Sequence, residues 1–340
     1  MTGKRVTSLD VARRAGVSRS VVSAVINGTQ GIGVSNEKRQ AVLDAMMELN
    51  YHVDAQARAM KTGKSYCIAA FGDTSNALFL QMLEGAQRAC AGHGYTVLLV
   101  GEASREEARE ELIHLYLQRR IDGIISLDGP GYQNEAWAQR LLELDIPYIS
   151  VEGYAENDHI CSVLADYGDS VTAALNYLES RHEQVPIYLR MTADWPTDNW
   201  AERARLEAYL QYCQAKQAAP VVHTLPKEHV DAMESLLLAI HREQGTQIYL
   251  SNWVDGAIDL YRAAARLNLT IGQDLYVMSA DNTYRISDHM VPRLSAMAVP
   301  YKAMGEQAVE LLMAQIHGDG EPPDGASCWL KAELLPGESS

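Results

Sequence analysis

Apolar residues near the start of the chain recur with a helical period in two short stretches separated by a glycine. The first stretch runs from about Leu9 to Ala15, and Gly16 permits the positive φ of a sharp turn. Ser18 is a good N-cap for a second helix, Arg19 to Ile26. The residues able to face a core are Leu9, Val11, Ala12, Ala15, Val21, Val22 and Val25. The pattern predicts a helix-turn-helix; the alternative is an ordinary surface helical hairpin.

A third helix and a short hinge segment follow. Ser35 can cap a helix that ends at Leu49, and its apolar side would carry Val42, Leu43, Met46, Met47 and Leu49. Asp54 to Met60 is Ala-rich and permits a helix, and residues 61–65 read as a polar linker. A seven-residue helix is marginal alone, so we expect it to form when something docks against it. The linker is not a phosphate-binding loop, because Arg58 stands where that motif needs glycine.

From Tyr66 onward, short apolar runs alternate with helical periods. This alternation predicts α/β architecture with parallel sheets covered by helices on both faces. So many units indicate two α/β subdomains, divided near Ala165. The predicted strands are Tyr66–Phe71, Tyr95–Val100, Gly123–Leu127, Pro147–Val151, Val185–Leu189, Gln247–Leu250 and Leu275–Ser279. The predicted helices include Leu78–Ala91, Arg105–Arg119, Asp169–Glu179, Glu202–Cys213, Val230–Arg242 and Val254–Leu267.

Charge divides the chain in the same place as the hydrophobic pattern. The whole chain carries a net charge of −15. Residues 1–64 hold ten Lys/Arg and five Asp/Glu, a net charge of +5, which leaves −20 for residues 65–340. A phosphate backbone would attract the first segment and repel the rest. Local charge therefore favours nucleic-acid binding by the N-terminal segment alone.

Other bulk properties are ordinary. No run approaches a membrane span, and the N-terminus lacks a signal-peptide pattern, so we expect a cytoplasmic protein. The five cysteines are scattered, and no Cys/His cluster suggests zinc, so we expect reduced thiols, no metal and no cofactor.

Motifs along nearly the whole chain resemble the lactose-repressor (LacI/GalR) family. The specific part is N-terminal, and the later motifs are individually weak but occur in matching order. They are Leu9–Ala12, Ala15–Ser18, Val22-Ser23, Asn27-Gly28, Val34-Ser35, Tyr51, Ala57-Arg58, Thr62–Ser65, Gly85, Gly94-Tyr95, Asp122–Ile125, Ile146-Pro147, Asp281, Pro292, Leu294 and Met304-Gly305.

The resemblance implies an all-α helix-turn-helix domain (1–52), a hinge helix and linker (53–65), and an effector-binding and dimerisation core (66–340). The core would resemble periplasmic sugar-binding proteins, with one subdomain at about 66–165 and 294–322 and the other at about 166–293 and 323–340. Such a protein is a transcriptional repressor that binds pseudo-palindromic operator DNA as a homodimer or larger assembly. The implied DNA-binding residues are Thr7, Ser18, Arg19, Ser20, Val21, Ser23, Asn27, Ala57 and Met60.

The chain departs from the family pattern at three places. Ala24 stands in the recognition helix where an arginine is usual, so the operator can deviate. In the hinge, Met60 replaces the leucine that usually wedges into the minor groove, and Val53-Asp54 replaces Pro-Asn. Methionine is apolar and flexible enough for the wedge. Asn252-Trp253 stands where Asn-Asp is common, which alters the effector pocket.

In parallel sheets, ligands bind beyond the carboxyl ends of the strands, so polar residues that follow strands are candidates for the effector pocket. The family pattern also places a guanidinium in the cleft, from Arg205 or, in the competing register, Arg203. The alternative for Arg205 is a structural ion pair, and for the aromatic residues it is packing. The predicted effector residues are Asn76, Phe79, Asp128, Glu152, Arg205, Asn252, Trp253, Asp281 and Tyr301, with Trp195 and Trp200 as further stacking candidates.

Two other functions compete. An enzyme fused to a helix-turn-helix, such as a sugar kinase, would need a phosphate-binding glycine motif or a metal cluster, and the sequence has neither. The protein could also be an activator, or a repressor that needs a co-repressor. The sequence does not distinguish these, because the direction of regulation depends on operator placement and on how the ligand is coupled to DNA binding. A sugar is the effector that the family implies, and the tryptophans leave a nucleoside open.

Overall fold

The computed structural model describes residues 6–27, 33–52, 55–101, 105–157, 159–192, 199–226, 230–318 and 327–340. It divides into two compact units, residues 1–66 and 67–340. The boundary falls at the end of the predicted linker.

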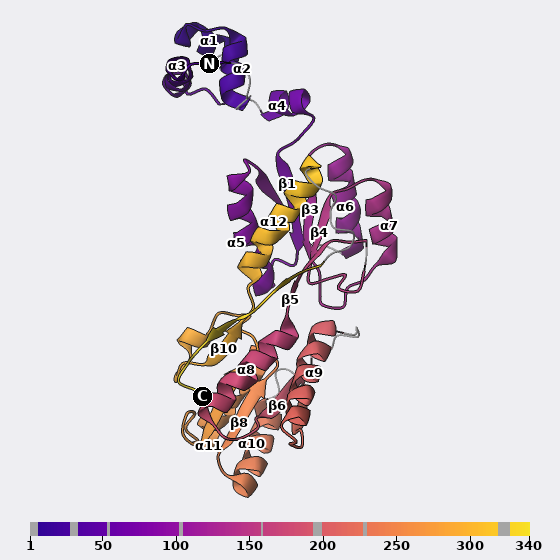
Figure 1. Ribbon diagram of the computed structural model, residues 1–340, viewed down its shortest axis with the longest axis vertical. Helices are drawn as coiled ribbons and strands as arrows, with labels where there is room; N and C mark the ends of the chain where they lie inside the picture. The colour runs from indigo at the N-terminus through magenta and orange to yellow at the C-terminus, as the bar shows by residue number, and fades with distance from the viewer. Residues whose placement is uncertain are drawn as a thin grey trace. The chain divides into compact units, whose positions relative to one another are not determined.

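The first unit is helical and contains the predicted helix-turn-helix. Its helices are α1 (Ser8–Ala15), α2 (Arg19–Asn27), α3 (Asn36–Glu48) and α4 (Ala55–Thr62) (Figure 1). Gly16 adopts a φ of 66° between α1 and α2, as the turn requires. The hydroxyl of Ser35 caps α3 by accepting the Lys38 N–H at 3.4 Å. The buried core of α1–α3 consists of Val11, Ala12, Val22, Val25, Val42 and Ala45.

Three residues expected in this core are exposed instead: Leu9, Leu43 and Met47. In α3 the buried residues Val42 and Ala45 are three positions apart and define the inward stripe. Leu43 and Met47, four apart, form the neighbouring stripe, which faces outward. The prediction was wrong here because it counted every apolar residue of a short helix toward one face.

Helix α4 corresponds to the predicted hinge helix and extends two residues past Met60 to Thr62. Asp54, the predicted start, lies outside the described residues. The Thr62 hydroxyl donates to the Arg58 carbonyl at 2.9 Å. The Arg58 guanidinium carbon lies 3.4 Å from the centre of the Tyr66 ring. This cation–π contact supports a helix that is otherwise marginal at this length.

The second unit begins with a parallel sheet in the order β11-β5-β4-β3-β1-β2. Helices α5 and α12 cover one face, and α6 and α7 cover the other (Figure 1). The strands are β1 (Cys67–Gly72), β2 (Thr96–Gly101), β3 (Ile124–Leu127), β4 (Tyr148–Val151), β5 (Ser162–Ala165) and β11 (Cys328–Leu330), and the helices are α5 (Ala77–Gly92), α6 (Arg105–Leu117), α7 (Glu135–Glu143) and α12 (Tyr301–His317).

A second sheet has the order β12-β10-β9-β8-β6-β7, in which only the β10–β12 pair is antiparallel. Helices α8 and α9 pack on one face, and α10 and α11 on the other. The strands are β6 (Ile187–Thr192), β7 (Val222–Pro226), β8 (Gln247–Ser251), β9 (Leu275–Ser279), β10 (Ser295–Ala298) and β12 (Glu333–Leu335), and the helices are α8 (Tyr167–Arg181), α9 (Trp200–Ala215), α10 (Val230–Gln244) and α11 (Val254–Leu267). A short 3₁₀ helix, η1 (Ser287–His289), precedes β10.

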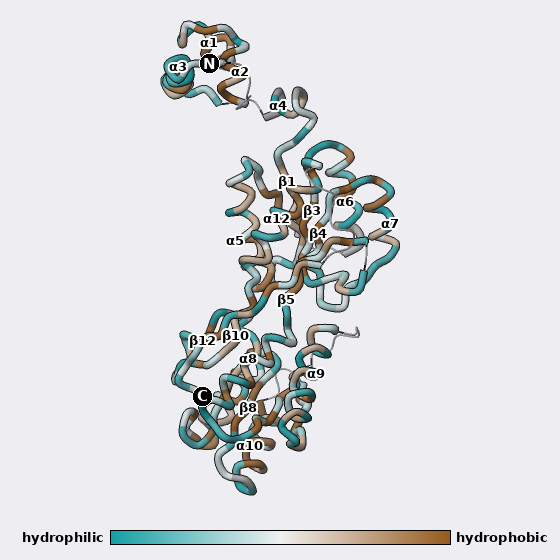
Figure 2. The backbone as a smooth tube through the Cα atoms, viewed as in Figure 1, coloured by the Kyte–Doolittle hydropathy of each residue, from teal (hydrophilic) through white to brown (hydrophobic). Residues whose placement is uncertain are grey.

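The predicted fold is confirmed, with two α/β subdomains and mostly parallel sheets. All seven predicted strands are present, as β1–β4, β6, β8 and β9, and Figure 2 shows hydrophobic stretches at β1, β3 and β8. The sequence did not reveal β5, β7, β10, β11 or β12. These strands are three to five residues long, and none of them contains isoleucine, whereas β3 and β4, of four residues each, do.

The chain crosses between the two subdomains three times: from β5 to α8, from β10 to α12, and from β11 to β12. These crossings correct the predicted boundaries. Residues 294–298 were expected with the first sheet, but β10 pairs with β9 of the second. Residues 328–330 were expected with the second sheet, but β11 pairs with β5 of the first. A short apolar strand can extend either sheet, and only its partner decides which.

Two glycines bring α5 and α12 into backbone contact. A Cβ on Gly85 would lie 1.9 Å from the carbonyl oxygen of Lys302, and a Cβ on Gly305 would lie 2.0 Å from that of Met82. No side chain fits at either position, so the two helices pack more closely than larger residues would allow.

Candidate functional site

The N-terminal end of α2 is an exposed polar surface. Ser18, Arg19 and Ser20 are exposed there. The Ser18 hydroxyl accepts the Val21 N–H at 3.4 Å and lies 2.7 Å from the Ser20 hydroxyl. Arg19 donates from Nε to the Ser8 hydroxyl at 3.0 Å, which ties the start of α2 to α1. This is the end that a recognition helix presents to base edges in the major groove.

The other predicted DNA-binding residues differ from one another in hydrogen bonding and in exposure. The Asp10 carboxylate accepts both the N–H and the hydroxyl of Thr7, at 2.9 and 2.6 Å, so Thr7 helps to begin α1. Val21 and Ser23 are half-buried on α2. The side chains of Asn27 and Ala57 lie outside the described part of the structure. Met60 is 89% exposed on α4, which is unusual for a large apolar side chain.

A buried arginine lies where the two subdomains of the core meet. Asn199 caps α9 by accepting the N–H groups of Ala201 and Glu202, and one turn later Arg205 points inward with no exposed surface. Its guanidinium carbon lies 4.1 Å from the Tyr167 ring centre and 3.9 Å from that of Trp253.

None of the three Arg205 nitrogens has a hydrogen-bond partner among the described residues. A buried, unpaired guanidinium is costly unless a ligand satisfies it. Arg203, the competing register, is instead on the surface and pairs with Glu156 at 3.2 Å.

Glu152 reaches the same place from the other subdomain. It follows β4 with a φ of 72°, a strained conformation that is concentrated at functional sites. Its side chain is buried, and the Tyr167 hydroxyl donates to Oε1 at 3.0 Å. The second oxygen, Oε2, has no partner in the described ranges. Burial raises the pKa of Glu152 to about 8, against the opposing hydrogen bond from Tyr167 and the charge of Arg205.

Asp281 and Tyr301 complete this group, and we call Glu152, Tyr167, Arg205, Trp253, Asp281 and Tyr301 the Arg205 cluster. Asp281 follows β9, is buried, and accepts the N–H and hydroxyl of Thr283 at 2.9 and 3.1 Å. Burial raises the pKa of Asp281, and the charge of Arg205 opposes that rise. The cluster thus brings together residues from α8, α9, α12 and the ends of β4, β8 and β9.

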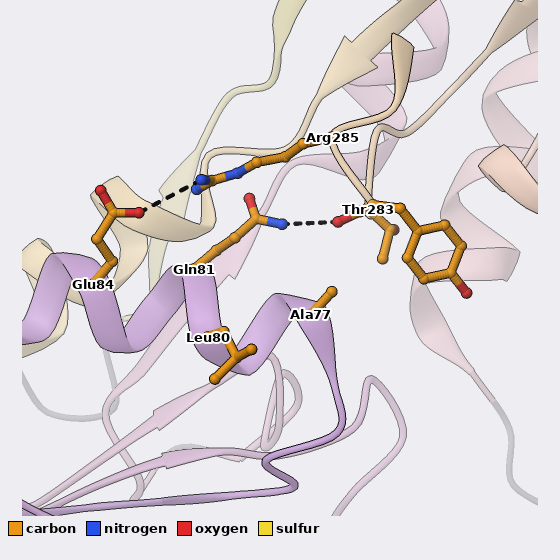
Figure 3. Close-up of a pocket in the computed structure, with 7 residues that line it drawn as sticks. Ala77, Leu80, Gln81, Glu84, Thr283 and Arg285 are labelled. Carbon is orange, nitrogen blue, oxygen red and sulfur yellow. Dashed lines mark hydrogen bonds and ion pairs between the residues drawn. The ribbon is translucent and has the colours of Figure 1, made fainter. Parts of the chain in front are cut away.

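A shallow cavity of about 250 Å³ bridges the subdomains between α5 and the loop after β9 (Figure 3). Gln81 donates from Nε2 to the Thr283 carbonyl at 2.8 Å, and Arg285 lies 3.5 Å from Glu84, which also pairs with Lys302. Thr283 therefore links α5 to the Arg205 cluster. Its carbonyl accepts a hydrogen bond from Gln81, while its N–H and hydroxyl donate to the Asp281 carboxylate.

Four predicted effector residues have internal partners instead of a free face. Asp128 accepts from Arg109 at 2.5 Å and from the hydroxyls of Ser126, Tyr148 and Ser150 at 2.7–2.8 Å, because both its oxygens face a buried polar network. Asn252 exchanges two hydrogen bonds with the backbone of Met191. The other two are Asn76, which caps α5, and Phe79, which packs beneath Gly72.

Among the remaining aromatic candidates, Trp200 donates from Nε1 to the Glu152 carbonyl at 3.1 Å and contacts the Tyr167 ring, while Trp195 lies outside the described residues. Tyr167 and Thr283 are neighbours of the Arg205 cluster that the sequence did not reveal. Tyr167 lies two residues after Ala165, where the sequence predicted the division between the subdomains, and this position could have marked it as a candidate.

The described residues carry neither a metal-binding cluster nor a membrane-spanning helix. No group of three or more His, Cys, Asp or Glu side chains there is placed to hold a metal ion. No helix in that part of the chain is both long and apolar enough to cross a bilayer.

Comparison with known proteins matches both units. The family model for "Bacterial regulatory proteins, lacI family" matches residues 7–54, and that for "Periplasmic binding protein-like domain" matches residues 176–340. The transcriptional repressor PurR of Edwardsiella ictaluri is 27% identical over 91% of this chain and 90% of its own length. The sucrose operon repressor of Pediococcus pentosaceus is 27% identical over 95% and 94%.

Solved structures agree on the fold. The Lac repressor dimer bound to operator and the anti-inducer ONPF superposes with a TM-score of 0.71 at 20% identity, over 99% of both chains. A lacI-type DNA-binding domain followed by a periplasmic binding protein-like core is the domain organisation of a DNA-binding transcriptional regulator. The chain belongs to the lacI family of bacterial regulatory proteins.

Proposed function

We propose that this protein is a cytoplasmic transcriptional repressor whose operator affinity is controlled by a sugar or sugar-like effector bound at the Arg205 cluster. The observation that carries the effector site is the fully buried Arg205 guanidinium, which has three nitrogens and no hydrogen-bond partner among the described residues. The proposed contacts to the effector come from Glu152, Arg205, Trp253, Asp281 and Tyr301.

The DNA-binding part is proposed to be residues 1–64. Its net charge of +5 beside a strongly acidic core, and the exposed Ser18, Arg19 and Ser20 at the start of α2, support this. We propose that Arg19 and Ser20 read base edges in the major groove, that Ser18 caps α2 or contacts a phosphate, and that Met60 of α4 wedges into the minor groove.

The regulation is proposed to follow from the position of the cluster across both subdomains. Arg205 and Asp281 belong to the second subdomain, and Glu152 and Tyr301 to the first. A ligand that touches both can favour one relative orientation only through different contacts in the two states. The resulting coupling to DNA is typically about 1–3 kcal/mol and is reciprocal. Whether the effector induces or co-represses follows from which orientation it favours.

A homodimer on a pseudo-palindromic operator is also proposed. The core exposes large apolar side chains at Leu80 on α5 and Leu99 on β2, both in the first subdomain, and a second copy that packs there would cover them. In a dimer, reorientation of the subdomains would change the spacing of the two hinge helices.

The test is selection of duplexes from a random library by the full chain, followed by titration of the selected site. We expect two half-sites related by symmetry and a loss of affinity of about 10³-fold or more between 50 and 200 mM salt. Arg19→Ala should relax sequence preference, whereas Arg13→Ala, on the exposed side of α1, should affect all sequences alike. Deletion of residues 1–64 should abolish binding; unchanged operator binding by the deletion variant would refute the proposal.

A further inference from the structure

Hydrogen-bond donors dominate the unsatisfied groups of the Arg205 cluster. Arg205 contributes three nitrogens that have no partner in the described part of the chain. The cluster's other unsatisfied atom is Oε2 of Glu152. Asp281 accepts two hydrogen bonds from Thr283, and the acceptor sites left on its two oxygens are fewer than the five N–H groups of Arg205. A ligand that fills this place must therefore supply more acceptors than donors.

The aromatic contacts of Arg205 leave its donors available. The rings of Tyr167 and Trp253 lie about 4 Å from the guanidinium carbon, and these contacts stabilise the positive charge without accepting an N–H. The N–H groups lie in the guanidinium plane and form a fixed fork. Such a fork fits a planar pair of oxygens, which a carboxylate provides.

Glu152 adds a donor rather than an acceptor near neutral pH. Its pKa of about 8 leaves the carboxyl mostly protonated at pH 7, so that Oε2 or its proton faces the ligand. A neutral polyol has a hydroxyl hydrogen for every hydroxyl oxygen, so it offers the N–H groups of Arg205 fewer acceptors for each donor than a carboxylate does. An unsatisfied buried donor costs about 1–3 kcal/mol.

We propose that the effector carries a carboxylate, as an acidic sugar derivative does, and that Arg205 binds this carboxylate through two N–H groups while Glu152 donates to a second oxygen. This inference rests on the proposed function, since it takes the Arg205 cluster as the effector site and adds the chemical class of the ligand.

The pH dependence separates a carboxylate effector from a neutral one. The titratable and charged groups that face Glu152 are Tyr167 from α8, Arg205 from α9 and Tyr301 from α12. Above pH 8 Glu152 becomes an anion and repels a bound carboxylate, so affinity falls as pH rises from 7 to 9. A neutral sugar would instead donate a hydroxyl to the ionised Glu152, and its affinity would rise or stay level.

The experiment measures thermal stabilisation and calorimetric affinity of the full chain with matched ligands. D-Glucuronate, D-galacturonate and D-gluconate are compared with D-glucose, D-galactose, sucrose, D-ribose and hypoxanthine. We expect at least one acid to bind, with at least tenfold higher affinity than its neutral parent. Arg205→Gln should remove this binding. Arg203→Gln, two residues away on the surface of the same helix, is the matched control and should bind as the parent does.

The outcomes are decisive in both directions. Stronger binding of a neutral sugar or of hypoxanthine would overturn the carboxylate while it leaves the proposed function intact. Failure of all three acids to bind, or acid binding that survives Arg205→Gln, would also overturn it. If Arg205→Gln does not fold, Glu152→Gln decides, since it must bind the acid with an affinity that no longer changes between pH 7 and 9. Loss of operator selection by the full chain would count against the proposed function instead.

Discussion

The hydroxyl groups of Tyr167 and Tyr301 lie 2.7 Å apart and join two of the three crossings between the subdomains. Tyr167 begins α8 directly after the first crossing, and Tyr301 begins α12 directly after the second. Trp329 of β11 precedes the third, and its ring contacts that of Trp200, which contacts Tyr167. The side chains at the three crossings therefore form one connected group, and Tyr167 also contacts Arg205. A ligand held by Arg205 would therefore be linked through Tyr167 to the segments that connect the two subdomains.

The buried carboxyl of Glu152 should make stability depend on pH. Its pKa rises from an ordinary 4.5 to about 8 on folding, so the folded state binds the proton more tightly. The resulting stabilisation is fully present below about pH 4.5 and is lost as pH rises toward and through 8. In urea unfolding at pH 5, 6, 7 and 8, the free energy of unfolding of wild type should decline relative to that of Glu152→Gln. The exposed Glu183→Gln should parallel wild type; an equal slope in all three proteins would contradict the prediction.

The buried Arg109–Asp128 pair should be structural. Both side chains are largely buried, and Asp128 holds four donors. Asp128→Ala would leave a buried guanidinium uncompensated and should lower the free energy of unfolding by about 3–5 kcal/mol. The control is Asp231→Ala, which removes an exposed partner of Arg266 at 2.7 Å and should change stability little. Similar losses in the two variants, measured by chemical denaturation, would refute this role.

The contact between Gln81 and the Thr283 carbonyl should hold the loop that carries Asp281. Gln81→Ala removes one hydrogen bond between the subdomains, worth about 1 kcal/mol, so the Thr283 amide should exchange with deuterium about fivefold faster. Gln211→Ala is a matched control, because the Gln211 side chain donates only to Glu207 within the surface of α9. Unchanged exchange at Thr283 in Gln81→Ala would show that the loop is held by other contacts.

Met60 should contribute to specific DNA binding alone. Its side chain is 89% exposed on α4, where it can enter a kinked, flexible base step. Met60→Ala should lose about 1–3 kcal/mol of affinity for the selected operator and little for random duplex DNA. Met47→Ala, at a 71% exposed methionine of α3, serves as the control and should change neither. Equal losses on both DNAs would contradict a wedge.

Most of the helix-turn-helix and the strand–helix alternation could be predicted from the sequence. The turn at Gly16, the caps at Ser18 and Ser35, and the seven predicted strands depend on neighbours a few residues away, whose spacing is visible in the chain. The exposed stripe of Leu43 and Met47 could not be assigned, because a helix of this length is almost as apolar on two faces.

The composition of the candidate site could be predicted only in part. The sequence favoured Arg205 but left Arg203 as a competing register, and it offered Asp128 and Glu152 as equivalent acids that follow strands. Burial separated the arginines: Arg205 is enclosed, and Arg203 pairs with Glu156 at the surface. Long-range partners separated the acids, since Arg109 and three hydroxyls occupy Asp128 while Glu152 keeps an oxygen without a partner in the described residues.

The sequence by itself determined the alternation of strands and helices, the DNA-binding unit and the class of fold, because periodicity, capping and local charge are properties of short segments. Tertiary structure alone decided which sheet β10 and β11 join and which polar side chains meet. Tyr167 and Tyr301 are 134 residues apart and share a hydrogen bond only because two separate crossings run side by side. The free energy of a buried polar group depends on the partners that folding brings to it from distant parts of the chain, and spacing along the sequence does not record them.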